Sequence, residues 1–349
     1  MKNKINLLLT LSILFLLLNC SGKSYPKISQ VYIPSVKTQS TTTIGEPISL
    51  PPVVQQRTPK QETFRVPAPS VEPTSKYGMS RFYSKFKLPS KIKESSGLIK
   101  VDNKLWTLTD SGGKAELYQI DEQNGRIIKT FKVQNASNKD WEDLAFDDTY
   151  VYIGDFGNNR GNRKDLKIYK IPRASLETQK SAKAEIIHFK YSDQKNFKAS
   201  SQQSNYDCEA MVARNGKLYL FSKNWGNKKT RLYELATTAG KHDAKYISTF
   251  NTQSMVTGAS INKELNLLIL TTYSSLLDVN VWAFSNFKGN DLLGGKAKKL
   301  HFQNTMFGQI EGVTFIDNYK AYLSSESFKK YIVSLDSMLY TLDFSGEFE

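Results

Sequence analysis

The sequence contains few of the residues that common enzymes and metalloproteins rely on. Among its 349 residues are only three histidines and two cysteines. None of the histidines stands in a motif that would complete a serine protease triad, and no Cys/His spacing fits a zinc site. GxSxG and Walker motifs are also absent. The two cysteines, Cys20 and Cys208, offer no disulfide framework, so stability must come from a hydrophobic core.

Long hydrophobic runs are also lacking. The longest extends from Ile5 to Leu18, after Lys2 and Lys4, and is too short to span a bilayer core of about 30 Å. It has the length typical of an export signal. Cys20 follows directly, and the ending Leu-Leu-Asn-Cys resembles the lipobox of bacterial lipoproteins, although Asn19 replaces the usual small residue. We therefore predict that Cys20 is lipidated, with simple secretion as the alternative.

Ser21, the residue after Cys20, is not the aspartate that favours retention in the inner membrane of enteric bacteria. We therefore expect an exported protein that is anchored by its lipid in the cell envelope, in the outer membrane. The membrane is then one partner of the chain.

Proline is nearly confined to one segment. Nine of the eleven prolines lie between residues 26 and 73, among Ser, Thr and Gln. Such a composition cannot bury enough apolar surface to offset its ordering entropy. The sequence therefore predicts a signal peptide over residues 1–19, a disordered tether over 20–78 and a folded domain over 79–349.

The formal net charge is +15. A nucleic-acid-binding role would also require aromatic side chains within a basic stripe, which we do not find. We expect no nucleic-acid partner.

The folded part contains an internal repeat. Five segments begin equivalent units: SSGLIK (95–100), WEDLAF (141–146), CEAMVA (208–213), VTGASIN (256–262) and IEGVTF (310–315). Short aromatic and β-branched strands separated by turn residues follow each segment, as is typical of propeller blades. The last unit has only three strands, and RFYSKFKL (81–88) supplies the missing fourth. We predict an all-β, five-bladed propeller closed by its N-terminal strand, with six blades as the alternative.

Acidic residues recur at one position of the innermost strands. Aligning the repeats gives Ser96, Glu142, Glu209, Thr257 and Glu311. Alternation along a strand would point these side chains toward the central axis. Converging glutamates repel unless a cation, a proton or water compensates them. We predict a divalent cation, Ca²⁺, held by Glu142, Glu209 and Glu311 with Asp110 and Asp155 nearby. The alternative is a hydrated channel whose acids pair with Lys223 or with solvent.

The long loops between the second and third strands share a face with these acids and carry many basic residues. A basic rim around an acidic centre suits an anionic ligand, such as a phosphate or a uronate, and Trp225 offers a ring for sugar stacking or anchors its own loop. The predicted ligand-binding residues are Asn158, Arg160, Arg163, Lys223, Trp225 and Glu326.

The runs DSGGKAELYQID, NKDWEDLAFDD, YIGDFGNNRGNRKDLKIYKIP, YDCEAM and LYLFSKNW resemble a group of uncharacterised exported bacterial propellers. More distantly, they are similar to gluconolactonase and esterase-like phytase propellers. The resemblance implies an axial, carboxylate-bound divalent metal, with Glu142, Glu209 and Glu311 at the matching positions. The ligand sets of those enzymes are not fully reproduced here.

These patterns favour a lipid-anchored envelope propeller that binds a small molecule, a glycan or a protein on its loop-rich face. Two alternatives stay open. One is a metal-dependent hydrolase of lactones or phosphoesters, or a glycosidase with paired carboxylates. The other is a pure protein-interaction module.

Overall fold

The computed structural model describes residues 64–65, 80–302, 308–330 and 332–347. All of them belong to one compact unit, Phe64–Glu349. The predicted signal peptide, Cys20 and nearly all of the predicted tether lie outside the described residues. No helix in the described part is long and apolar enough to cross a membrane.

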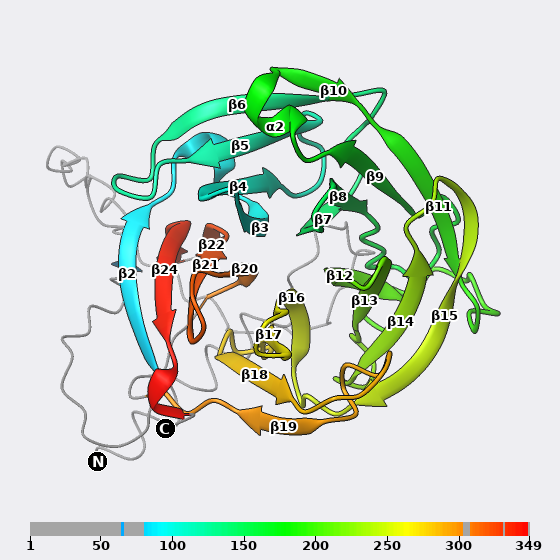
Figure 1. Ribbon diagram of the computed structural model, residues 1–349. Coiled ribbons are helices and arrows are strands. Elements are labelled where there is room, and N and C mark those ends of the chain that lie inside the picture. The colour runs from blue at the N-terminus through cyan, green and yellow to red at the C-terminus, as the bar shows by residue number, and fades with distance from the viewer. Residues whose placement is uncertain (1–63, 66–79, 303–307, 331, 348–349) are drawn as a thin grey trace, which may run out of the picture. The chain divides into compact units, whose positions relative to one another are not determined.

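Twenty of the described strands form five antiparallel units of four strands each, which we number as blades (Figure 1). Blade 1 consists of β3 (Ser95–Val101), β4 (Lys104–Thr109), β5 (Glu116–Ile120) and β6 (Ile127–Gln134). Blade 2 consists of β7 (Trp141–Phe146), β8 (Tyr150–Asp155), β9 (Lys167–Pro172) and β11 (Glu185–Tyr191). Blade 3 consists of β12 (Asp207–Arg214), β13 (Lys217–Lys223), β14 (Thr230–Ala236) and β15 (Gly240–Phe250). Blade 4 consists of β16 (Met255–Asn262), β17 (Leu267–Tyr273), β18 (Val279–Ser285) and β19 (Lys296–Lys299). Blade 5 consists of β20 (Ile310–Phe315), β21 (Lys320–Ser325), β24 (Met338–Asp343) and β2 (Arg81–Lys87).

The blades surround a common centre. Each first strand contacts the first strands of both neighbouring blades, and β20 contacts β3 to complete the cycle. Five clusters of buried side chains fill the spaces between neighbouring blades, for example Trp106 and Trp141 between blades 1 and 2. The core is therefore divided among the blade interfaces, and the predicted all-β propeller fold is confirmed.

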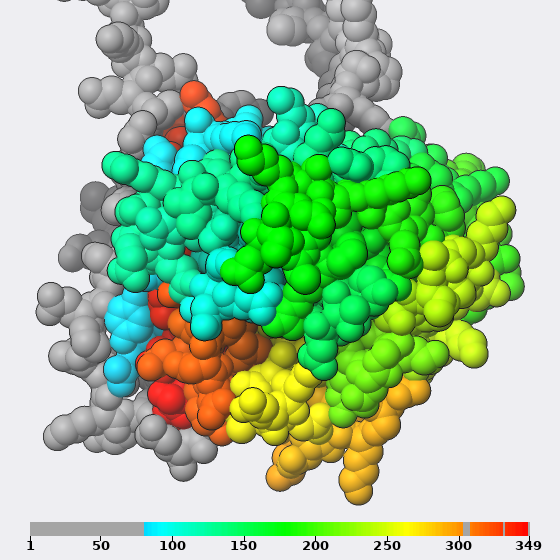
Figure 2. Space-filling view, turned by 45° about the horizontal axis from the view of Figure 1, so that its top comes forward, coloured from blue at the N-terminus to red at the C-terminus, as the bar shows by residue number. Residues whose placement is uncertain are grey.

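The N-terminal strand completes blade 5, as the sequence predicts. β2 pairs with β24 in antiparallel register from Arg81, opposite Asp343, to Lys87, opposite Met338. Phe82 packs with Tyr340 and Leu342 in the core between blades 4 and 5. In the space-filling view the red C-terminal residues lie beside the cyan N-terminal ones (Figure 2). Strands from the two ends of the unit thus share one sheet.

Parallel pairing covers several outer strands. β11 of blade 2 pairs with β15 of blade 3, which joins the two blades into an eight-stranded sheet. A short strand, β10 (Ser181–Lys183), pairs in parallel with β6 of blade 1. An uncovered edge would expose unpaired backbone groups to other chains, so these pairs protect the unit from edge-to-edge association.

The loop between β21 and β24 forms a hairpin of its own, with β22 (Phe328–Lys330) and β23 (Val333–Leu335). The short β1 (Phe64–Arg65) pairs in parallel with β23. Helical structure among the described residues is limited to α2 (Ser175–Thr178) and the 3₁₀ turns η1 (Ser90–Ile92) and η2 (Ser345–Glu347).

A register irregularity recurs at one place in every blade. The pairing between first and second strands shifts around Ser96, Glu142, Glu209, Thr257 and Glu311. A β-bulge leaves an extra residue outside the ladder and re-aims its side chain. The five positions aligned from the sequence are therefore bulges of the innermost strands.

Candidate functional site

The bulge residues divide into two kinds. Ser96 and Thr257 donate hydrogen bonds from their hydroxyls to backbone carbonyls of the next first strand, Glu142 O and Ile310 O, each at 2.5 Å. The other three are Glu142, Glu209 and Glu311, and each is at most 4% exposed. The two hydroxyls therefore connect neighbouring strands, while the three glutamates bring carboxylates to the centre.

Three carboxylates meet between blades 1 and 2. Asp110 follows β4, while Asp140 and Glu142 lie just before and within β7. Each offers an oxygen, and these oxygens all lie within 4.8 Å of one another. We call these residues the Asp110 cluster. Of the predicted metal ligands, the structure brings Asp110 and Glu142 together here and adds Asp140.

Further acids lie close enough to influence this cluster electrostatically. Together with it they form what we call the central carboxylates: Asp110, Asp140, Glu142, Asp207, Glu209, Glu311 and Glu326. Lys223 at the end of β13 is buried among them, and its Nζ lies 3.2 Å from Glu209 Oε2. Lys223 was predicted to lie on the basic rim, but the structure pairs it with an axial glutamate.

The central carboxylates resist ionisation. Burial, with a contribution from Asp140, raises the pKa of Asp110 to about 7. Burial and Asp207 raise the pKa of Asp140 to about 6. Burial raises the pKa of Glu311 to about 7 even though Lys223 opposes the shift. The pKa of Glu142 is raised well above its ordinary value by burial and by Asp110. Carboxyl groups held this close therefore favour a bound proton or cation.

Lys223 compensates only part of this charge. Burial alone would lower the pKa of its ammonium, but Glu209 and the other acids raise the pKa well above the ordinary value. Arg163 approaches Asp140, with 3.8 Å between Nη1 and Oδ2. Within the described part of the chain, no ion pair reaches Asp110, Glu142 or Glu311. Most of the negative charge thus has no cationic side chain in contact.

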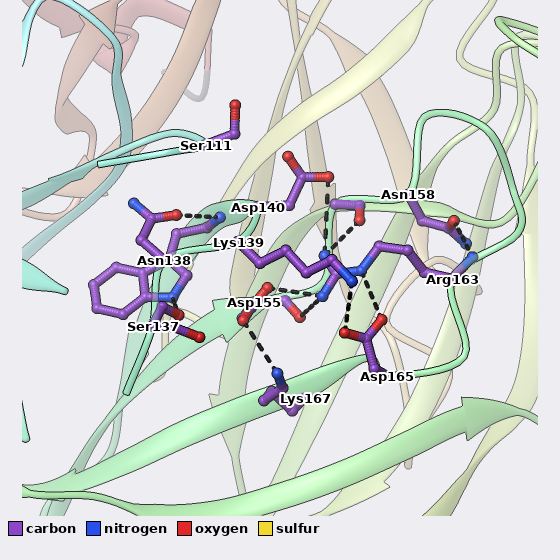
Figure 3. A network of polar contacts seen from close by, with 12 residues as sticks. Ser111, Ser137, Asn138, Lys139, Asp140, Asp155, Asn158, Arg163, Asp165 and Lys167 are labelled. Atoms are coloured by element: carbon purple, nitrogen blue, oxygen red, sulfur yellow. Dashed lines mark hydrogen bonds and ion pairs between the residues drawn. The ribbon is translucent and has the colours of Figure 1, made fainter. Parts of the chain in front are cut away.

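Asp155 is held by basic side chains outside the Asp110 cluster (Figure 3). Its Oδ1 accepts a hydrogen bond from Arg163 Nη2 at 2.8 Å, and its Oδ2 lies 3.5 Å from Lys167 Nζ. Arg163 also donates to Gly157 O at 2.8 Å and to Asp165 at 3.2 Å. These contacts make Asp155 and Arg163 a brace of the loop between β8 and β9.

Two predicted ligand-binding residues, Asn158 and Trp225, anchor loops in the structure, and for Trp225 this was one of the two expected roles. The Asn158 amide donates to Tyr206 O at 2.9 Å, and its backbone N–H donates to Asp207 Oδ1 at 2.5 Å. Trp225 Nε1 donates to Asp207 Oδ2 at 2.7 Å. Asp207 therefore ties two loops of the same face to β12.

The other two predicted ligand-binding residues, Arg160 and Glu326, lie in different parts of the site. Arg160 is exposed on the loop between β8 and β9. Glu326 is half-buried after β21, its backbone N–H donates to Gln309 O at 2.9 Å, and burial raises the pKa of its carboxyl well above the ordinary value. Arg160 belongs to the rim, and Glu326 to the central carboxylates.

Two observations test whether a cation fits this centre. Glu311 Oε2 is buried and has no hydrogen-bond partner. Gly157 leaves room for the cluster, because a Cβ there would lie 2.0 Å from Glu142 Oε1 and 2.6 Å from Asp140 Oδ2. Carboxylate oxygens are the ligands that calcium prefers. An orphaned acceptor and a glycine whose missing Cβ lets two carboxylates approach each other both fit a bound hard cation.

Asp140 and Asp207 were not among the site residues predicted from the sequence. Both stand two positions before a bulge glutamate, in Asp140-Trp141-Glu142 and Asp207-Cys208-Glu209. Trp141 and Cys208 are fully buried, so the acids on either side of each face the centre together. The repeated Asp-x-Glu pattern of blades 2 and 3 was the available signal.

Comparison with known proteins contributes no further argument about the site. No protein family and no curated protein matches this sequence. Among solved structures, a chain of the crystal structure of a mitotic checkpoint complex matches with a TM-score of 0.34 and 13% sequence identity. The match covers 70% of this chain and 60% of that one. At this TM-score and identity the likeness carries no conclusion about this chain.

Proposed function

We propose that this chain is an exported, lipid-anchored β-propeller of the cell envelope, in the outer membrane, that binds a divalent cation among its central carboxylates. A ligand on the loop-rich face is then bound partly through that cation. The observation that carries the proposal is the Asp110 cluster, whose three oxygens lie within 4.8 Å of one another.

The donor set favours calcium. Ca²⁺ binds six to eight oxygen ligands and tolerates irregular geometry. The Asp110 cluster offers three carboxylates, and Glu311 Oε2 is a further acceptor without a partner. No histidine or cysteine belongs to this cluster, and zinc and copper sites usually contain such ligands. A hard, oxygen-binding cation matches the residues present.

Cation binding would also relieve the repulsion among the acids. A cation that binds only the folded state raises the free energy of unfolding by about 2.7 kcal/mol at a hundredfold excess over its dissociation constant. Calcium should therefore raise the melting temperature of the purified domain, and a chelator should reverse the rise.

The decisive comparison uses Glu142→Gln. This variant keeps the shape of the side chain but removes a charge from the Asp110 cluster, and it should lose the calcium-induced rise while still folding. Glu122→Gln is the matched control, because Glu122 pairs with Lys100 at 2.8 Å outside the central carboxylates. An equal calcium response in the two variants, or none in wild type, would contradict the proposal.

Gly157→Ala tests the arrangement of the cluster itself. Its added methyl group would collide with Glu142 Oε1 and Asp140 Oδ2 while all carboxylates are retained. We expect calcium affinity to fall at least tenfold by isothermal titration calorimetry. Unchanged affinity would show that the cation does not bind at this cluster.

Exposed basic side chains around the central carboxylates suit an anionic ligand. Lys114, Arg160 and Lys229 are exposed on loops of the face that carries the Asp110 cluster. A uronate carboxylate can contact a cation and a basic side chain at once. Digalacturonate should therefore bind wild type in calcium but not in chelator. Binding of equal strength in both conditions would exclude the cation from the interaction.

The anchor is tested separately. Cys20→Ala should move the protein from the detergent phase to the aqueous phase, since lipidation needs the thiol. Detergent partitioning that does not change would contradict lipidation without affecting the calcium proposal.

A further inference from the structure

A groove lies on the outer edge of the unit, where β11 and β15 run side by side (Figure 1). Its volume is about 480 Å³, within the range of small-molecule sites. The lining residues are Lys164, Leu166, His188, Phe189, Lys190, Lys241, His242 and Asp243. Two of the three histidines in the chain therefore line this one groove. We call it the seam groove.

The backbone fixes which charges meet in the seam groove. In the parallel pair, His188 stands opposite Lys241, and Lys190 stands opposite Asp243. Residues opposite each other project from the same face of a sheet. All four are exposed, whereas Phe189 between them is buried. The pairing of two blades thus gathers basic side chains from strands far apart in the sequence.

The charges of the seam groove are unbalanced. Lys190 Nζ lies 3.5 Å from Asp243 Oδ1, so these two largely compensate each other. In the described part of the chain, no carboxylate lies within ion-pair distance of Lys164 or Lys241. Two ammonium groups and the His188 imidazole therefore face the groove without a matching acid, whereas His242 stands opposite Phe189 and its Nε2 lies 2.8 Å from Thr238 O. An anion can bind there without displacing an existing ion pair.

We propose that the seam groove binds a soluble phosphorylated ligand. Ammonium groups and imidazole N–H groups are suitable donors for phosphate oxygens. The volume exceeds the needs of a single ion and accommodates an attached sugar or similar small group. Leu166 and Phe189 line the groove but are buried, so neither apolar side chain projects from the groove into a bilayer. A soluble ligand therefore fits better than a lipid headgroup.

The site is separate from the central carboxylates. Those lie on or beside first and second strands, whereas the seam groove is formed by the outermost strands of blades 2 and 3, with Lys164 and Leu166 added by the loop between β8 and β9. The seam groove can therefore be tested without any cation. Inorganic pyrophosphate in a chelating buffer is a suitable probe, because calcium cannot then mediate its binding.

The test compares two double variants by isothermal titration calorimetry. Lys164→Gln with Lys241→Gln removes the unpaired charges, and pyrophosphate affinity should fall at least tenfold. Lys180→Gln with Lys183→Gln is the matched control, since these exposed lysines also lie at an outermost, parallel-paired strand. The control should bind like wild type. Equal losses in both variants, or no binding by wild type at millimolar pyrophosphate, would overturn the proposal.

A third variant should strengthen binding. Asp243→Asn removes the carboxylate that engages Lys190, so the groove gains an available cation and loses a repulsive charge. Pyrophosphate affinity should rise severalfold, and an unchanged or weaker affinity would contradict the assignment.

Flotation with phosphatidylglycerol vesicles tests whether the seam groove binds a lipid headgroup. Binding to vesicles without binding to pyrophosphate would contradict the proposal that the ligand is soluble.

Discussion

Glu209 and Lys223 face each other at the centre of the propeller, with 3.2 Å between Oε2 and Nζ and each side chain more than nine-tenths buried. Glu209 stands at the bulge of β12, and Lys223 ends β13. The pair combines an axial acid with a buried cation from the same blade. Breaking such a pair leaves an uncompensated buried charge, which is more costly than losing an exposed ion pair.

Lys223→Met should therefore destabilise the calcium-free domain by about 3–5 kcal/mol. The change keeps an apolar stem but leaves Glu209 and its neighbours without their cation. The free energy of unfolding should be measured in urea at pH 8, where protonation relieves less of the repulsion. Added calcium should recover more stability in this variant than in wild type, because it no longer competes with an ammonium group.

Lys228→Met is the control for this experiment. Lys228 also lies over the Trp225 ring, at 5.6 Å, but makes no carboxylate contact within the described residues. The Lys228→Met change should lower the free energy of unfolding only slightly. Equal losses in the two variants would show that the Lys223 effect comes from packing rather than charge.

The raised pKa values predict a pH dependence with a definite sign. Asp110 shifts from 3.8 to about 7, Asp140 from 3.8 to about 6 and Glu311 from 4.5 to about 7. The folded state therefore holds protons that the unfolded state releases. Their stabilising contribution is complete below pH about 4 and is lost as pH rises through about 6 to 7. In chelator, the melting temperature should fall between pH 5 and pH 8.

Calcium should reverse this trend. Because calcium and protons compete for the same oxygens, the calcium-induced rise in melting temperature should be small at pH 5 and large at pH 8. A rise of the same size at both values would indicate binding away from the central carboxylates.

Asp143 provides a test of structure rather than of cation binding. Its two oxygens accept hydrogen bonds from the backbone N–H groups of Leu144 and Met211, each at 2.7 Å. The second bond connects β7 to β12. Asp143→Ala would leave both donors unsatisfied in a buried site, at a cost of about 1–3 kcal/mol.

Asp143→Asn retains one acceptor and should lose less stability than the alanine variant. Neither change should alter calcium affinity, because Asp143 is not part of the Asp110 cluster. A large loss of affinity with normal stability would instead place Asp143 among the cation ligands.

The fold was predictable because the blades repeat. Alternating apolar strands and the missing fourth strand of the last unit indicate both the architecture and its closure, which β2 and β24 confirm. The parallel pairing of β11 with β15 left no comparable signal. It depends on how two neighbouring blades meet rather than on a pattern within either strand.

The site was predictable only in part. Alignment of the repeats placed Glu142, Glu209 and Glu311 at equivalent positions, and the structure brings all three to the centre. The partners of individual side chains could not be derived in the same way. Arg163 was predicted as a cation of the basic rim, yet it pairs with Asp155. Only the hydrated-channel alternative paired Lys223 with an axial acid, as it pairs with Glu209 in the structure. Such pairings depend on loop conformation, which alternation along a strand does not encode.

The last prediction concerns closure of the ring. Deleting residues 1–78 should leave stability nearly unchanged, because β2 is retained. Deleting residues 1–88 removes β2 and exposes the edge of β24, which should cause aggregation in size-exclusion chromatography. Phe82→Ala tests the same contact in the full domain. It should lower the free energy of unfolding by about 3–5 kcal/mol, because Phe82 is buried between blades 4 and 5. Tyr83→Ala, at a half-buried position on the other face of β2, is the control and should cost less. If the shorter domain stays monomeric and as stable as the longer one, β2 does not close the propeller.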